Sequence, residues 1–206
     1  MNTPHKTLHV AILAFDEVEA LDLAGPFEVF TTASRMAQRA HPNAPVPFGV
    51  TCVARSPEPV RARAGMVIVP THAFANVPPV DVLIVPGGVV DAIMGCQETL
   101  DWIAGVHHHT QLTASVCTGA FLLAASGVLT KGPATTHWED QAELARQFPA
   151  LDVQSAKRWV DQGKLITSGG ISAGIDMSLH MVSRLTSEAL ALRTARQMEF
   201  QWTHNP

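Results

Sequence analysis

The chain has 206 residues, 47% of them hydrophobic and 16% charged, so it can bury a sizeable core, and intrinsic disorder is excluded. Its net charge of −4, from 14 basic and 18 acidic residues without a basic cluster, argues against nucleic acid and anionic membranes as partners. An apolar run at residues 8–15 is too short to span a membrane and lacks a cleavage site, so we expect a cytoplasmic protein, with one domain over residues 1–206.

The first predicted strand, residues 8–15, is short and almost wholly apolar, which is typical of a strand buried on both faces of a sheet. A helix is expected from Pro26 to about residue 37, because proline suits the first helical turn. Asp22 would then lie in the loop between this strand and this helix, at the edge where open parallel sheets build their sites. The alternative role for Asp22 is that of a capping or turn carboxylate.

Further buried strands are predicted at residues 48–54, 66–69 and 81–85. The last of them ends in Gly87 and Gly88 after a proline. Two glycines after a strand allow the backbone to approach a ligand closely, although they also suit a plain tight turn.

A helix predicted over residues 98–109 ends in His107, His108 and His109. Adjacent helical residues point in different directions, so at most two of the three could share a metal ion. We interpret this run as a solvated helix end and expect no metal or organic cofactor. The 3 cysteines of the chain cannot all pair and form no CxxC motif, so neither a disulfide framework nor a zinc ribbon is expected.

The most informative stretch joins a predicted strand at residues 111–116 to a predicted helix at residues 119–126. Only Cys117 and Thr118 separate them, so the turn is tight and places a thiol at the start of a helix. Free amides and the partial positive charge of a helix N-terminus favour a thiolate, which is the nucleophilic form. The alternative is a small, inert, buried cysteine.

In the C-terminal third we predict a short strand or loop at residues 131–136 and a helix at 137–147. Two strands joined by a turn follow at 152–160 and 164–168, and two helices at 172–185 and 187–198. Strands and helices alternate along most of the chain, which predicts a doubly wound α/β sandwich with a mostly parallel sheet and helices on both faces. In such a sheet the loops after the strands share one edge. Asp22, the glycine pair after residue 86, the cysteine turn and Gly169-Gly170 are therefore expected to converge on one pocket.

Five segments, in this order, resemble the ThiJ/PfpI superfamily: LDLAGP at residues 21–26, VPGG at 85–88, SVCTG at 115–119, TTHW at 135–138 and GISAGID at 170–176. The resemblance implies a flavodoxin-like fold with a nucleophilic cysteine at the elbow. Within the superfamily the motifs are most similar to those of isonitrile hydratases. That similarity implies cysteine-dependent hydration of a small isonitrile to an N-substituted formamide through a thioimidate, in a homodimer.

By this resemblance, Cys117 is the expected nucleophile and Asp22 the expected acid and base, while Thr118 contributes its backbone N–H and its hydroxyl. The amides of Gly87 and Gly88 are expected to form a donor pair facing the reacting atom. The other residues expected at the substrate site are Gly119, His137 and Gly170. For the histidine, a structural role at the site wall or the dimer interface is favoured over catalysis.

Two alternatives stay open. The same motifs occur in AraC-type regulators, which read DNA through a helix-turn-helix domain that this chain, ending at Pro206, is expected to lack. The protease branch of the superfamily has His at the position of Thr118, and the deglycase branch has Glu at the position of Asp22. The alternatives are therefore an enzyme acting on reactive carbonyls or peptides, and a sensing domain in which Cys117 is oxidised or binds a ligand.

Overall fold

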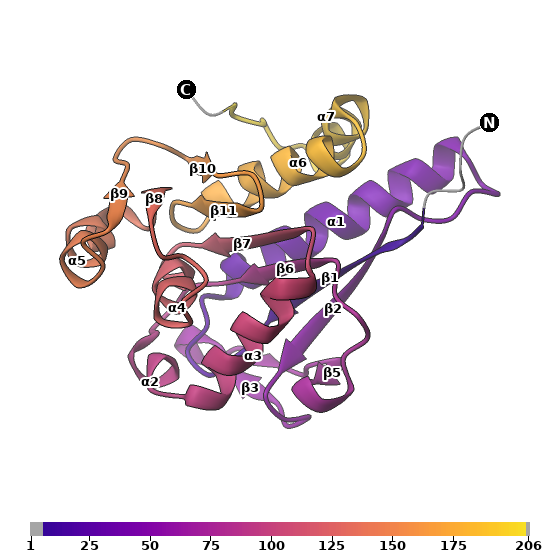
Figure 1. Cartoon of the computed structure of the whole chain (residues 1–206). Helices are drawn as coiled ribbons and strands as arrows, with labels where there is room; N and C mark the ends of the chain where they lie inside the picture. Colours follow the sequence, from indigo (N-terminus) through magenta and orange to yellow (C-terminus); the bar gives the residue numbers. More distant parts are fainter. Residues whose placement is uncertain (1–5, 205–206) are drawn as a thin grey trace.

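The fold is built on one central sheet, which in the computed structural model has seven strands within the described residues, 6–204 (Figure 1). In spatial order they are β10 (Trp159–Asp161), β11 (Leu165–Ser168), β7 (Leu112–Val116), β6 (Val82–Val85), β1 (Leu8–Leu13), β2 (Phe48–Ala54) and β5 (His72–Ala73). Every neighbouring pair is parallel except β10 and β11, which form an antiparallel hairpin. All residues of β6 and β7 are buried, as expected for strands covered on both faces.

Helices cover both faces of this sheet (Figure 1). One layer contains α1 (Ala20–Ala40), α6 (Ala173–Leu185) and α7 (Glu188–Gln197), which pack on one another. The other contains α2 (Asp91–Met94), α3 (Gln97–His109) and α4 (Gly119–Ala125). At one end, α5 (Gln141–Gln147) packs on a small parallel pair of strands, β8 (Gly132–Ala134) and β9 (Leu151–Val153). The predicted doubly wound, flavodoxin-like sandwich is confirmed.

None of the helices in residues 6–204 is long and apolar enough to cross a membrane.

Helix α1 starts earlier than its proline indicated. It begins at Ala20, so the prediction of a start at Pro26 is wrong, and Asp22 lies in the first turn of the helix instead of the preceding loop. The reason is a tertiary contact: the Glu19 amide donates to the carbonyl of Gly87 at 2.9 Å and holds the helix start against the loop after β6. Pro26 is left inside the helix, where it cannot donate to the Asp22 carbonyl.

Residues 152–160, predicted as one strand, belong to two: β9 pairs with β8, whereas β10 pairs with β11 in the central sheet. Residues 66–69 also do not join the central sheet, because β4 (Val67–Ile68) forms a hairpin with β3 (Val60–Arg61). The short elements β5 and α2 were not predicted, since two to four residues are too few to show a period.

Candidate active site

The cysteine elbow is a strained turn held by hydrogen bonds from neighbouring segments. Cys117 has φ 55°, a left-handed backbone conformation that costs a side-chain-bearing residue on the order of 1–3 kcal/mol. Its amide lies 3.2 Å from the carbonyls of both Ser168 and Gly169, and its own carbonyl accepts from Thr136 Oγ1 at 2.7 Å. Neighbouring segments therefore hold the strained turn in place, with the side chain at the carboxyl edge of the sheet.

Gly119 allows helix α4 to start immediately beside β6. A Cβ at this position would lie 2.1 Å from the Val85 carbonyl oxygen, so only glycine fits. The resemblance placed Gly119 at the substrate site. In the structure, its backbone packs against the carbonyl groups of Val85 and Pro86, next to the cysteine turn.

The Asp22 carboxyl is fully buried, at 0% exposure, next to the elbow. Its Oδ2 accepts a hydrogen bond from the Gly87 amide at 3.0 Å, while Oδ1 has no hydrogen-bond partner among the described residues. Burial is the main cause that raises the pKa of Asp22 to about 7, and the charge of Glu19 adds to the rise. The Gly87 amide, and more weakly the Cys117 thiol and the Ile171 amide, lower this pKa. The carboxyl and the thiol are thus close enough to act on each other.

The Cys117 side chain does not behave as the sequence predicted. It is only 8% exposed, and burial, then the Asp22 charge, raise its pKa to about 12 in spite of the opposing Thr118 amide. Burial is the largest cause of this rise, and the charge of Asp140 adds to that of Asp22. Burial and these two charges therefore oppose the resting thiolate that the sequence predicted, and favour the protonated thiol.

The amides of Gly87 and Gly88 do not form the predicted pair of free donors. The first donates to Asp22, and the second donates to Thr118 Oγ1 at 2.9 Å. The Thr118 hydroxyl in turn donates to the Gly88 carbonyl at 2.8 Å. The two glycines therefore position the carboxyl and the threonine, and the Thr118 amide is the donor that faces the sulfur.

His137 and Gly170 meet at the wall of the site. A Cβ on Gly170 would lie 2.1 Å from His137 Cδ2, so glycine is needed for the ring to lie there. The His137 ring is 20% exposed, and its Nδ1 lies 3.5 Å from Asp140 Oδ2 and 3.7 Å from Glu139 Oε2.

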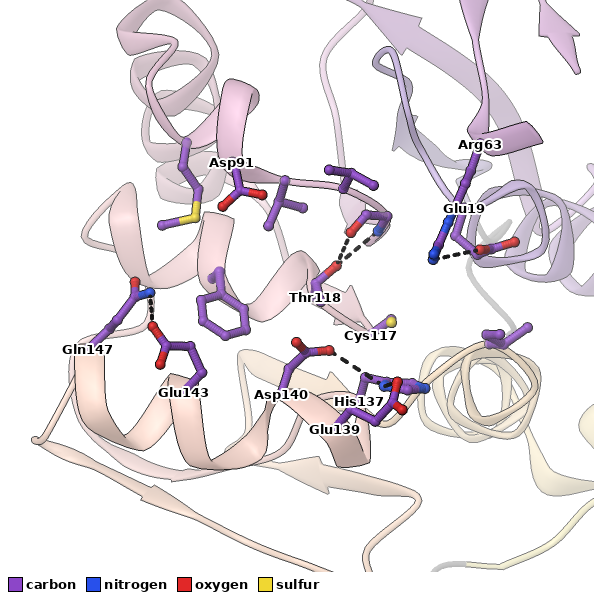
Figure 2. A pocket seen from close by; sticks show the side chains of 16 residues that line it. Glu19, Arg63, Asp91, Cys117, Thr118, His137, Glu139, Asp140, Glu143 and Gln147 are labelled. Carbon is purple, nitrogen blue, oxygen red and sulfur yellow. Dashed lines mark hydrogen bonds and ion pairs between the residues drawn. The ribbon is translucent and has the colours of Figure 1, made fainter. Parts of the chain in front are cut away.

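A cavity of about 390 Å³ opens over Cys117, with Thr118 and His137 in its wall (Figure 2). Several of its lining residues were not predicted from the sequence, among them Arg63 from the β3–β4 hairpin and Ile171, which has φ 51°. Arg63 gave no local signal, because only the fold brings its hairpin to the sheet edge. Ile171 was inside a motif already singled out. Across residues 6–204 no group of His, Cys, Asp or Glu side chains is arranged to hold a metal ion.

The doubly wound sandwich, with a cysteine on a strained strand-to-helix turn, is typical of α/β proteins that carry a nucleophile elbow. Residues 8–184 match the DJ-1/PfpI family, and the chain belongs to this family. The superfamily resemblance derived from the five motifs is confirmed.

Named relatives include one enzyme and several transcriptional regulators. Isonitrile hydratase from Pseudomonas putida is 34% identical over 200 residues, covering 97% of this chain and 79% of that protein. The HTH-type transcriptional regulator GbdR from Pseudomonas aeruginosa is 28% identical over 146 residues, covering 71% of this chain and 40% of the regulator. A crystal structure of a ThiJ/PfpI family protein from Pseudomonas syringae has a TM-score of 0.83 at 30% identity, over 98% of this chain and 78% of that one.

Proposed function

We propose that this protein hydrates isonitriles to N-substituted formamides, with Cys117 as the nucleophile and Asp22 as the group that carries the proton. The observation that carries the proposal is a buried carboxyl, with one oxygen unpartnered, beside the elbow thiol of a 390 Å³ cavity. The 34% identity to isonitrile hydratase supports the choice of substrate class.

In the first step, the Cys117 sulfur attacks the terminal carbon of R–N≡C. Ionised Asp22 takes the thiol proton and delivers it to the same carbon, so that one S–H bond breaks and C–S and C–H bonds form. The product is a thioimidate, R–N=CH–S, attached to the protein. A carboxyl with a pKa of about 7 can both accept and donate at neutral pH, and no free thiolate has to accumulate.

In the second step, water attacks the thioimidate carbon while Asp22 takes one of its protons and passes it to the nitrogen. The hydroxyl of the tetrahedral adduct then loses its proton, the C–S bond breaks, and the sulfur is reprotonated through Asp22. The formamide R–NH–CHO leaves and the thiol is restored, with one water consumed. The Thr118 amide stabilises the charge that develops on sulfur.

The test is incubation with an alkyl isonitrile and detection of the formamide by proton NMR. We expect turnover by the unaltered protein, none by Cys117→Ala, and full turnover by Cys96→Ala, whose thiol lies outside this cavity. No formamide from the unaltered protein, or undiminished turnover by Cys117→Ala, would overturn the proposal. Methylglyoxal and a peptide amide, added in parallel, test the carbonyl and peptide alternatives.

A second candidate function, a sensing domain, is favoured by the similarity to the regulator GbdR. Because burial raises the pKa of Cys117, little of the oxidisable thiolate is present at neutral pH, so such a sensor would act through ligand binding in the cavity. Saturable binding without turnover of any candidate substrate would favour this reading.

The homodimer stays a prediction. Trp138 is 73% exposed beside His137, which makes it a large apolar side chain that an interface would cover. Light scattering measures the molar mass in solution, and a monomer at all concentrations would exclude the dimer.

A further inference from the structure

The loop that joins β11 to α6, residues 169–172, contacts both groups of the proposed reaction. The Gly169 carbonyl accepts a hydrogen bond from the Cys117 amide at 3.2 Å. Ile171 lines the cavity, and its amide lies close enough to the Asp22 carboxyl to lower the pKa of that group. The position of this β11–α6 loop therefore affects the thiol and the carboxyl together.

Ile171 is strained within the β11–α6 loop. Its φ of 51° lies in the left-handed region, which is unfavourable for a β-branched residue and persists only where the surrounding structure holds it. The support within the loop is weak: the Gly170 carbonyl accepts from the Ala173 amide at 3.2 Å. The Ile171 carbonyl accepts from the Gly174 amide at 3.3 Å. Both distances are at the long end of the range for such bonds, so the conformation needs support from outside the loop.

Arg158, just before β10, supplies this support at both ends of the loop. At the start of the loop, the Arg158 carbonyl accepts from the Gly169 amide at 2.9 Å. At the end of the loop, its Nη2 lies 3.4 Å from Ser172 Oγ, and the same guanidinium pairs with Asp176 in the first turn of α6. One residue thus bonds to the chain both before and after Ile171.

The Asp176 carboxyl gives the guanidinium a fixed anchor. It is fully buried; its Oδ2 accepts from Nε and Nη2 of Arg158, and its Oδ1 accepts from the Thr203 amide at 2.7 Å. A planar guanidinium that binds a carboxylate through two nitrogens fixes the orientation of the pair as well as its distance. Helix α6 packs against β10 and β11 (Figure 1), so the anchor belongs to the folded core. Neither side chain is among the lining residues of the cavity.

We infer that Arg158 is a positioning residue of this site, which by pairing with Asp176 holds the β11–α6 loop in place. The loop in turn keeps the Asp22 carboxyl away from water and the Cys117 amide bonded. The inference rests on the proposed function, since it assigns Arg158 a part in that reaction. Arg158 acts through the loop and touches no reacting atom.

Loosening the loop changes the pKa of Asp22 in a definite direction. Burial is the largest cause that raises this pKa, and the Ile171 amide is the smallest of the causes that lower it. When water enters beside the carboxyl, the loss of burial therefore outweighs the loss of this amide, and the pKa falls toward its ordinary value of 3.8. The titratable groups that act on Asp22, which are Glu19 and Cys117, are not themselves altered by a substitution of Arg158.

The test is the pH dependence of kcat/KM for an alkyl isonitrile in two variants. Arg158→Lys keeps a positive charge beside Asp176, but a single ammonium lacks the fork that also reaches Ser172. The double variant Arg158→Gln with Asp176→Asn leaves no buried charge without a partner, which avoids the unfolding expected when one partner alone is removed. In both we expect the plateau of the profile to fall about tenfold and its midpoint to move down by about 1 pH unit.

The midpoint distinguishes positioning from a purely structural role. A partly unfolded sample loses rate in proportion to its unfolded fraction, but the Asp22 carboxyl of the folded fraction ionises as before. A midpoint that stays in place in both variants would overturn the inference.

Arg184→Lys is the matched control. Arg184 also joins α6 to β10, through Asp161 at 2.8 Å, and its side chain is 34% exposed against 33% for Arg158. It further donates to the Gly163 carbonyl, and neither of these partners belongs to the β11–α6 loop. We expect the midpoint of this variant to equal that of the unaltered protein. A shift as large as that of Arg158→Lys would contradict the assignment.

A titration without substrate separates this inference from the proposed function. Carbon-13 NMR of protein labelled at its aspartate carboxyls follows the ionisation of Asp22 directly, with Asp22→Asn to assign its signal. A lower Asp22 pKa in both Arg158 variants, in a protein that hydrates no isonitrile, would retain the positioning role and reject the hydratase. Hydration by the unaltered protein, with the same Asp22 pKa in every variant, would retain the hydratase and reject the positioning role.

Discussion

At the scale of single residues, burial acts on two acids at once. It raises the pKa of Asp22 to about 7 and that of Cys117 to about 12, so a proton is held more tightly by the thiol than by the carboxyl. A thiolate stabilised by a helix terminus would need no base. A buried thiol does need one, and in the proposed mechanism the unpartnered Oδ1 of Asp22 is that base.

The raised pKa of Asp22 predicts how the rate depends on pH. Only the carboxylate can accept the thiol proton, so kcat/KM for an isonitrile is expected to rise as the pH passes upward through about 7 and then to level off. Asp22→Asn is expected to lose the rising limb and about 10²–10⁴-fold in rate. Initial rates between about pH 5.5 and 8.5 measure both effects. A flat profile for the unaltered protein would show that Asp22 is not the base.

At the scale of elements, local patterns predicted most of the strands and helices but not all of their ends. The continuous apolar run of β6 and the short junction between β7 and α4 were read correctly, since each depends on adjacent residues. The start of α1 was misread, because the helix begins at Ala20, next to the hydrogen bond from the Glu19 amide to the distant Gly87 carbonyl, and continues through Pro26. The split of residues 152–160 between two sheets likewise depends on partners distant in the chain.

Two glycine-to-alanine substitutions test whether the elbow depends on close packing. Gly119→Ala places a Cβ 2.1 Å from the Val85 carbonyl and is expected to lower the free energy of unfolding by about 1–3 kcal/mol, since backbone must shift. Gly105→Ala, within α3 and with no atom within 4 Å of its Cβ, is expected to raise it by about 0.5–1 kcal/mol. Urea denaturation measures the free energy of unfolding of both variants. Equal changes in the two variants would show that the elbow does not depend on close packing at Gly119.

At the scale of the whole molecule, the parallel order of β1, β6, β7 and β11 brings segments far apart in the chain to one edge of the sheet. Asp22 therefore lies beside Cys117 and is buried by the assembled layers rather than by its own neighbours. The burial that raises the pKa of this carboxyl also opposes folding whenever the carboxyl is charged.

The cost of burying the charged Asp22 carboxyl predicts how the stability of the fold depends on pH. The folded protein keeps a proton on Asp22 up to about pH 7, whereas the unfolded chain releases it near its ordinary pKa of 3.8. Since the folded state binds more protons in this window, stability falls as the pH rises from about 4 to 7, by on the order of 4 kcal/mol from this group. Asp22→Asn is expected to remove this slope. Urea denaturation across the window checks it, and parallel slopes for both proteins would contradict it.

The sequence by itself determined the α/β class, the order of most elements, the position of the cysteine elbow and the family, because short apolar runs and contiguous motifs are properties of neighbouring residues. Only the tertiary structure decided that burial raises the pKa of Cys117 and that the amides of Gly87 and Gly88 are already bonded. These properties depend on burial and on distances between separate segments, which no local pattern in the chain encodes.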